Sequence, residues 1–141
     1  MPPLLIFLLT TSFLSAVDSF RFEVKTIAED FSRPMGMDLG PDGSIYLIEL
    51  QGKVSRIHPT TGERITLAEI KVFGEQENGL LGIALDPNFK ENNHLFLLYS
   101  PADFIGQRIS RFTIKKETLI NEKKVIEWKT QRRECCTTAA C

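Results

Sequence analysis

Two polar residues, Gln76 and Glu77, stand shortly before an apolar segment that begins at Gly79, with Asn78 between them and that segment. A carboxylate in such a place can accept hydrogen bonds from the hydroxyl groups of a ligand, and its charge strengthens those bonds. The competing interpretation is structural, since a polar pair before a buried strand can simply solvate the loop. From the pattern alone the solvated loop is the simpler explanation, and a binding role for this pair is a hypothesis.

Two histidines, His58 and His94, are the candidate general bases, because imidazole titrates near neutral pH. His58 precedes Pro59 at the end of an expected strand, which predicts a surface turn residue. His94 follows an Asn-rich turn and opens the next apolar stretch, where a solvent-facing position is predicted. We therefore expect neither histidine to act as a catalytic base, and the sequence contains no catalytic residue that we can assign.

All three cysteines, Cys135, Cys136 and Cys141, fall within the last seven residues. Cys135 and Cys136 are adjacent, so they cannot form the C-x-x-C clamp of a metal site. Because no histidine lies nearby, we expect no zinc site and assign no metal ligands. In an oxidising compartment, Cys135 and Cys136 could pair with each other or with Cys141.

The composition is that of an ordinary globular protein. The chain has 141 residues, of which 43% are hydrophobic and 25% charged, and its formal net charge is -1. These values suit one soluble domain. A charge so close to zero gives no support for a nucleic-acid partner or an anionic membrane surface.

The N-terminal residues differ from the rest of the chain. Residues 4–17 are almost wholly apolar, and this length suits the core of a signal peptide better than a membrane span. We expect residues 1–19 to be a signal peptide, which predicts a secreted or periplasmic protein without a membrane span after cleavage. The lack of Lys or Arg in residues 1–3 argues against a signal peptide, and the alternative is an uncleaved N-terminal anchor.

The remaining sequence consists of short apolar stretches separated by turn residues, of which Pro41-Asp42-Gly43 is the strongest turn signal. No part of it keeps a helical period over three turns. This pattern is typical of an all-β protein built as a sandwich, barrel or propeller. The expected strands cover residues 22–27, 44–50, 53–57, 64–70, 80–85, 95–100, 108–114 and 125–128.

An internal repeat selects among these folds. Gly36 and Gly82 are separated by 46 residues, as are Pro41 and Pro87. A period in the forties made of short strands is typical of the blades of a β-propeller. The spacing widens downstream, so the second unit contains insertions. We expect six apolar residues of the second unit to pack between neighbouring sheets: Leu81, Ile83, Leu95, Leu97, Ile109 and Phe112.

The two units are fewer than a propeller needs, because stacked repeats require at least three copies for stability. Two blades alone would leave long unpaired strand edges, which natural proteins avoid. The sequence therefore predicts a partial propeller of about two blades. Such a chain would be either a fragment of a longer protein or a unit that assembles with other copies, and the fragment is the preferred interpretation.

Two stretches resemble the glucose/sorbosone dehydrogenase family. They are RPMGMDLGPDGSIYLIELQGKVSRI, from Arg33 to Ile57, and ENGLLGIALDPNFKENNHLFLLYS, from Glu77 to Ser100, followed by RISRF. Members of this family are soluble sugar dehydrogenases that use pyrroloquinoline quinone (PQQ) and are built as six-bladed propellers. The resemblance implies that residues 20–134 are the N-terminal part of such a propeller, about a third of the complete domain.

The resemblance also implies functional positions. In the family, the residue two places before the GLLG motif contacts the sugar, and this position is Glu77, with Gln76 beside it. The catalytic base is a histidine that follows a cysteine pair, and Thr137 stands in that place. Threonine cannot act as a base at neutral pH. We therefore expect residues 135–141 to be an aberrant or truncated tail.

The resulting hypothesis is the N-terminal part of a PQQ-dependent sugar dehydrogenase whose intact parent oxidises an aldose to its lactone. The resemblance implies PQQ, calcium, a sugar substrate and an electron acceptor for that parent. The quinone-binding residues and calcium ligands of the family come from later blades, so this chain is expected to bind neither group and to be inactive. The alternative is a non-catalytic propeller module that binds a partner through its loops.

Overall fold

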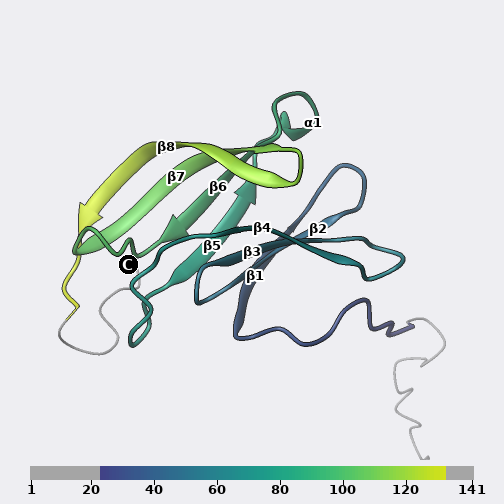
Figure 1. The fold of residues 1–141 in the computed structure, drawn as a ribbon, viewed down its shortest axis with the longest axis horizontal. Helices are drawn as coiled ribbons and strands as arrows, with labels where there is room; N and C mark the ends of the chain where they lie inside the picture. Colours follow the sequence, from purple (N-terminus) through teal and green to yellow (C-terminus); the bar gives the residue numbers. More distant parts are fainter. Residues whose placement is uncertain (1–22, 133–141) are drawn as a thin grey trace, which may run out of the picture.

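The computed structural model describes residues 23–132, which form two four-stranded antiparallel sheets (Figure 1). Within each sheet the strands follow one another in sequence order, as in a β-meander. The first sheet contains β1 (Pro34–Leu39), β2 (Ile45–Glu49), β3 (Lys53–Ile57) and β4 (Arg64–Glu69). The second contains β5 (Leu80–Leu85), β6 (His94–Tyr99), β7 (Gly106–Lys115) and β8 (Thr118–Lys129), with the short helix α1 (Phe89–Asn92) between β5 and β6.

Local sequence explains where the strands turn. Between β1 and β2, the Asp42 carboxylate accepts hydrogen bonds from the backbone N–H and the hydroxyl of Ser44, at 3.0 and 2.8 Å. Gly43 follows with a φ of 80°, a conformation that glycine adopts at little cost. Between β7 and β8, Lys116 and Glu117 both have positive φ values, as the tight turn of a two-residue hairpin requires.

The repeat seen in the sequence recurs in the pairing of the strands. Met37 pairs with Leu47 in the first sheet, and Ile83 pairs with Leu97 in the second. Each first strand also contains a register shift near its start, between Pro34 and Gly36 in β1 and between Leu80 and Gly82 in β5. The two sheets are therefore copies of one unit down to the position of a bulge, and the all-β prediction with about two blade-like units is confirmed.

The hydrophobic core lies between the two sheets. Figure 1 shows β5 next to β1, and most of the contact between the sheets involves β1, β2 and β5. Of the predicted core residues, Leu95, Leu97 and Phe112 are buried there and Ile83 packs against them. The other buried core residues are Tyr46, Ile48, Val54, Leu67, Leu80, Phe89 and Tyr99.

Part of the core prediction was wrong. Ile109 pairs with Leu98 and Ile126, and these positions lie on the side of the second sheet that faces away from the first. Leu81 stands at the register shift of β5 and is only half-buried. Both errors have one physical cause. A strand has two faces, and because apolar residues lie on both faces here, apolarity alone does not show which face is in the core.

Two strand predictions also fail. Residues 23–27, the described part of the first expected strand, are exposed and irregular, and the first strand is β1 instead. The last strand is much longer than the predicted 125–128, because β8 starts immediately after the turn at Lys116 and Glu117 and pairs with β7 along its length. Its many charged residues hid it, since an outermost strand with an exposed face needs little apolar sequence.

Two predicted segments lie outside the described residues: the signal peptide at 1–19 and the tail at 135–141, with its three cysteines and Thr137. Within residues 23–132, no helix is long and apolar enough to cross a membrane.

Candidate functional site

The loop that joins the two sheets, residues 70–79, contains both predicted binding residues. It is bonded to the neighbouring turns through its backbone. The Ile70 N–H donates to Gly52 O at 2.8 Å, and the Phe73 N–H donates to Ser100 O at the same distance. Gly79 O in turn accepts from the Ser100 N–H at 2.8 Å. The loop therefore belongs to one end of the molecule, together with the β2–β3 turn and the β6–β7 connection.

A buried polar network holds the end of this loop. Asn78 is fully buried, and its side-chain amide donates to Glu75 O at 3.0 Å. Its Oδ1 accepts from the Ser100 hydroxyl at 3.0 Å, and that hydroxyl accepts from Gln107 Nε2 at 2.9 Å. A buried polar group without a partner costs desolvation energy. This network therefore favours the single loop conformation in which Asn78, Ser100 and Gln107 are all paired.

Gln76 and Glu77 lie side by side on the surface of this loop, between Glu75 and the buried Asn78. Gln76 has a φ of 59°, in the left-handed region that costs energy for a residue other than glycine. The structure thus brings both predicted residues to an anchored, solvent-facing position. An exposed carboxylate and amide there can accept and donate hydrogen bonds to a polyhydroxylated ligand.

The two histidines lie at the opposite end of the strands from this loop. His58 follows β3, and its Nδ1 accepts hydrogen bonds from the backbone N–H groups of Thr60 and Thr61 at 3.3 and 3.2 Å. The surface turn predicted for exposed His58 is therefore confirmed. His94 opens β6 and is half-buried rather than fully solvent-facing. Neither histidine is near Glu77.

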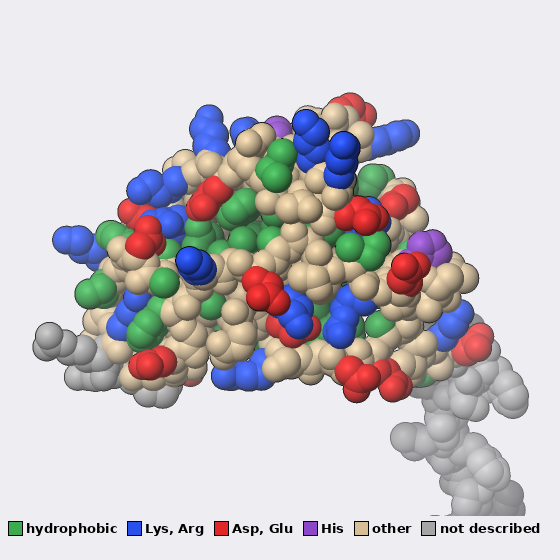
Figure 2. Space-filling view, in the orientation of Figure 1, with side chains coloured by type: hydrophobic (Ala, Val, Ile, Leu, Met, Phe, Trp, Pro, Cys, Tyr) green, Lys and Arg blue, Asp and Glu red, His purple; other side chains and the backbone are tan. Residues whose placement is uncertain are grey.

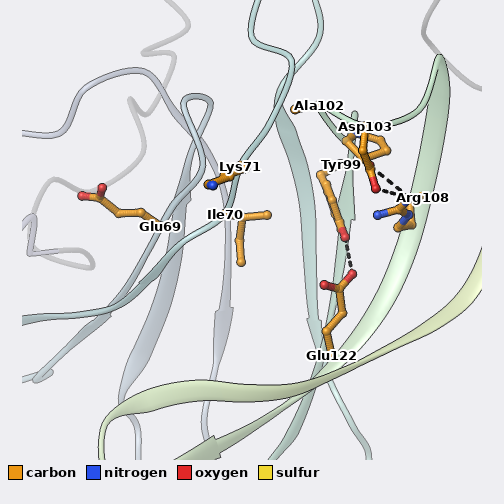
Figure 3. Close-up of a pocket in the computed structure, with 9 residues that line it drawn as sticks. Glu69, Ile70, Lys71, Tyr99, Ala102, Asp103, Arg108 and Glu122 are labelled. Carbon is orange, nitrogen blue, oxygen red and sulfur yellow. Dashed lines mark hydrogen bonds and ion pairs between the residues drawn. The ribbon is translucent and has the colours of Figure 1, made fainter.

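A cavity of about 390 Å³ lies between the sheets, where the end of β4 faces β6, β7 and β8 (Figure 3). The Tyr99 hydroxyl donates to Glu122 at 2.5 Å, and the Ser110 hydroxyl donates to the same oxygen at 2.7 Å. Arg108 donates to Glu127 at 2.6 Å and forms an ion pair with Asp103 at 3.2 Å. These polar groups on β6, β7 and β8 form a structural network, while Glu69 and Lys71 line the opposite side of the cavity and are exposed.

Sequence reasoning missed this cluster. Part of its signal was present, since Arg108 and Ser110 are polar residues at alternate positions of the predicted strand 108–114. Ser110 is paired with Glu122 and Arg108 with Glu127, both on β8, and the sequence pattern predicted only residues 125–128 of that strand.

Burial, together with the hydrogen bond to Glu122, raises the pKa of the Tyr99 phenol. At pH values between the ordinary tyrosine pKa of about 10 and this higher pKa, the Tyr99 phenol has lost its proton in the unfolded chain but keeps it in the folded chain. The stability from this group is thus present below about pH 10 and is lost as the pH rises through the folded pKa.

We therefore expect urea unfolding to show a fall in stability above about pH 10 that is shallower in Tyr99→Phe. Burial also raises the pKa of Tyr46, so Tyr46→Phe is expected to make the alkaline loss shallower as well. Equal alkaline losses in the wild type and in Tyr99→Phe would contradict the assignment.

The family profile described as Glucose / Sorbosone dehydrogenase matches residues 31–137. Quinoprotein glucose dehydrogenase B of Acinetobacter calcoaceticus is 32% identical over 93 residues, which are 63% of this chain and 20% of that protein. The chain thus spans about a fifth of the length of this curated relative.

Solved structures agree on the fold. The PQQ-bound aldose sugar dehydrogenase of Streptomyces coelicolor superposes with a TM-score of 0.70 at 25% identity, over 74% of this chain and 33% of that one. An oxidoreductase of Thermus thermophilus, described as a glucose dehydrogenase, gives a TM-score of 0.71 at 23% identity, over 77% and 33%. The chain corresponds to about a third of each, and the partial-propeller prediction is confirmed.

Proposed function

Because the chain belongs to the glucose/sorbosone dehydrogenase family, we propose that it supplies two blades and a sugar-contacting loop of a PQQ-dependent sugar dehydrogenase. In the complete propeller, Glu77 contacts the sugar through its carboxylate and Gln76 through its amide. The observation that carries this proposal is the anchored loop: both side chains are exposed, while Asn78 fixes the backbone beside them. The parent enzyme oxidises an aldose to its lactone and passes the electrons to an acceptor.

We also propose that this chain alone binds neither PQQ nor calcium, and two observations on the described residues support this. Within residues 23–132, no group of three His, Cys, Asp or Glu side chains could hold a metal ion. Arg132 donates to the carbonyls of Pro101, Phe104 and Gly106, and Arg108 is paired with acidic residues, so neither is available to bind a carboxylated quinone. We therefore derive no chemical step from this chain, and propose that it does not oxidise sugars alone.

We expect the chain, given PQQ, Ca²⁺ and an aldose, to leave an artificial electron acceptor unreduced. The Streptomyces enzyme assayed in parallel is the positive control. Reduction above the no-protein level would contradict the proposal that this chain alone is inactive.

The role of Glu77 is tested by grafting. Residues 31–132 would replace the matching third of the Streptomyces aldose sugar dehydrogenase, and the sugar dependence of acceptor reduction would be measured. In an active graft, Glu77→Ala is expected to weaken transition-state binding by about 1–3 kcal/mol, the usual cost of losing a charge-assisted hydrogen bond. Glu75→Ala removes a carboxylate from the same loop and is the matched control. Equal kinetics for the two variants would exclude sugar contact by Glu77.

The proposal includes the division of the chain. Residues 1–19 direct the protein to a secreted or periplasmic location, and the propeller part begins at residue 20. N-terminal sequencing of the chain recovered from the medium of a secreting host tests the first boundary, and an intact N-terminus would contradict it.

A further inference from the structure

Arg132, which follows β8, is a half-buried arginine that contacts two segments distant from it in the sequence. Its guanidinium group donates to backbone carbonyls in and beside the β6–β7 connection, residues 100–105, and lies over an aromatic ring of the loop formed by residues 70–79. By contrast, Figure 2 shows many Lys and Arg side chains at the surface, interspersed with Asp and Glu. The position of Arg132 therefore indicates a role inside the molecule.

Three carbonyl oxygens converge on one nitrogen of Arg132. Its Nη2 donates to Pro101 O at 2.9 Å, to Phe104 O at 2.6 Å and to Gly106 O at 3.1 Å. Oxygens that lie so close together repel one another through their partial negative charges, and the positive charge of the guanidinium offsets that repulsion. The connection also turns tightly, because a Cβ atom at Gly106 would clash with Trp128 O. Arg132 therefore stabilises one conformation of the β6–β7 connection.

The loop of residues 70–79 receives a direct contact from the same group. The guanidinium carbon of Arg132 lies 4.4 Å from the centre of the Phe73 ring, which is a cation–π contact. Burial lowers the pKa of Arg132, because the charged guanidinium is partly removed from water. The carbonyls and the ring offset that desolvation, so the charge favours the conformation in which Phe73 lies against Arg132.

The β6–β7 connection in turn holds the loop near both of its ends. At the first end, Val72 pairs with Pro101 in an isolated antiparallel bridge, and the Phe73 N–H donates to Ser100 O at 2.8 Å. At the other end, Asn78 Oδ1 accepts from the Ser100 hydroxyl at 3.0 Å. The connection is thus attached to the loop before and after the exposed part of the loop.

The exposed part of the loop is short, and it contains both candidate sugar-contacting residues. Residues 74–77 lie between the two attachments, and Glu75, Gln76 and Glu77 are exposed. The left-handed conformation of Gln76 has an energetic cost for a residue other than glycine, so attachments on both sides are needed to maintain it. A displacement of either attachment would therefore move Glu77.

We propose that Arg132 is a positioning residue for the sugar-contacting loop, and that it holds residues 74–77 in the conformation that presents Glu77 to the ligand. Arg132 acts through the β6–β7 connection and through Phe73, without touching the sugar itself. The expected effect on sugar oxidation rests on the proposed function. The attachment of the loop by Arg132 is independent of that function and is measured without any sugar.

Amide hydrogen exchange in the full 141-residue chain tests the attachment. Arg132→Met keeps an unbranched side chain but loses the donors and the charge. In this variant the hydrogen-bonded amides of Phe73 and Ser100 are expected to exchange at least about tenfold faster, while amides at the centre of β6 keep their rates. Arg132→Lys restores a positive charge with three N–H donors, so its rates are expected to lie close to those of the wild type. Lys129→Met removes an exposed charge from the end of β8 and is the matched control.

Kinetics in the active graft of residues 31–132 test the consequence for the sugar. Arg132→Met is expected to lower kcat/KM for the sugar at least about fivefold. Because Arg132 acts through the loop, the same substitution is expected to change kcat/KM by less than about twofold in a graft that already carries Gln76→Ala and Glu77→Ala. Circular dichroism checks that each variant is folded. If Arg132→Met does not fold, Phe73→Leu, which removes only the aromatic ring, replaces it in both measurements.

Two results would overturn the proposal. The first is a set of wild-type exchange rates in Arg132→Met, or exchange that is faster throughout the molecule and not only around the loop. The second is an effect of Arg132→Met on kcat/KM that persists undiminished in the graft without the Gln76 and Glu77 side chains. If Glu77→Ala left the kinetics unchanged while Arg132→Met accelerated the exchange, the proposed sugar contact would be contradicted and the attachment of the loop by Arg132 confirmed.

Discussion

Replacing Gly79 with alanine is expected to destabilise the fold by at least about 3 kcal/mol. Gly79 has a φ of 148°, and a Cβ atom there would lie 2.3 Å from Leu50 O. That oxygen cannot easily move away, because it accepts the Leu80 N–H at 2.9 Å and so joins the two sheets. The variant would therefore combine a strained backbone with a steric clash at the junction of the sheets. Urea unfolding followed by circular dichroism measures the loss.

Gly36→Ala is the matched control, because it makes the same substitution at a glycine with room for a Cβ atom. A Cβ at Gly36 would meet only side-chain atoms of Ile48 and Ile83, all at 3.9 Å, which is ordinary van der Waals contact. We expect this variant to change stability by less than about 1 kcal/mol. Similar losses for the two alanine variants would show that the clash with Leu50 O is not the cause.

The effect of Gly79→Ala reaches the candidate site. Glu77 stands two residues earlier, and the same loop end is held by Asn78 and Ser100. A displaced Gly79 would break its carbonyl bond with the Ser100 N–H. Two-dimensional NMR of the folded fraction is therefore expected to show shifted amide signals from residues 75–79 before those of distant strands.

Leu97→Ala is expected to cost about 2–5 kcal/mol, the usual range for removing a large buried side chain from a core. Leu97 is fully buried in the cluster between the sheets, on the central strand β6, and packs with Leu95 and Tyr99 of the same face. Truncation leaves a cavity at this position. The cavity cannot collapse easily, because β6 is paired with β5 on one side and with β7 on the other. In this variant, the two sheets are expected to separate in the same transition in which the chain unfolds, because this core joins the sheets.

The matched control for this variant is Ile105→Ala, which truncates an apolar side chain that is 65% exposed on the β6–β7 connection. Its stability is expected to stay within about 0.5 kcal/mol of the wild type. If Leu97→Ala also stayed within that range, the core between the sheets would not be the main source of stability.

Turn chemistry made much of the fold predictable. Pro41-Asp42-Gly43 marked a strand boundary, and the expected strands 80–85 and 95–100 lie within a residue of the observed bounds of β5 and β6. The exposed and charged elements were not predictable in the same way. β8 pairs with β7 through its backbone, and backbone pairing leaves no apolar pattern in an exposed strand.

The candidate site shows the same division. Gln76 and Glu77 are neighbours in the sequence, which was enough to predict that they lie together in the loop before a strand. The cluster of Tyr99, Arg108 and Glu122 depends on three strands, and its members come together only when the hairpin of β7 and β8 closes. Long-range polar partners of this kind leave no local signal.

The sequence by itself determined the all-β class, the repeating unit and the position of the loop that contains Gln76 and Glu77, because turns and strand periodicity are local properties. Only the tertiary structure decided which face of each strand is buried. Ile83 and Ile109 are equally apolar, yet Ile83 packs in the core and Ile109 faces outward. The physical reason is that alternation distinguishes the two faces of a strand but cannot assign the core when both faces are apolar.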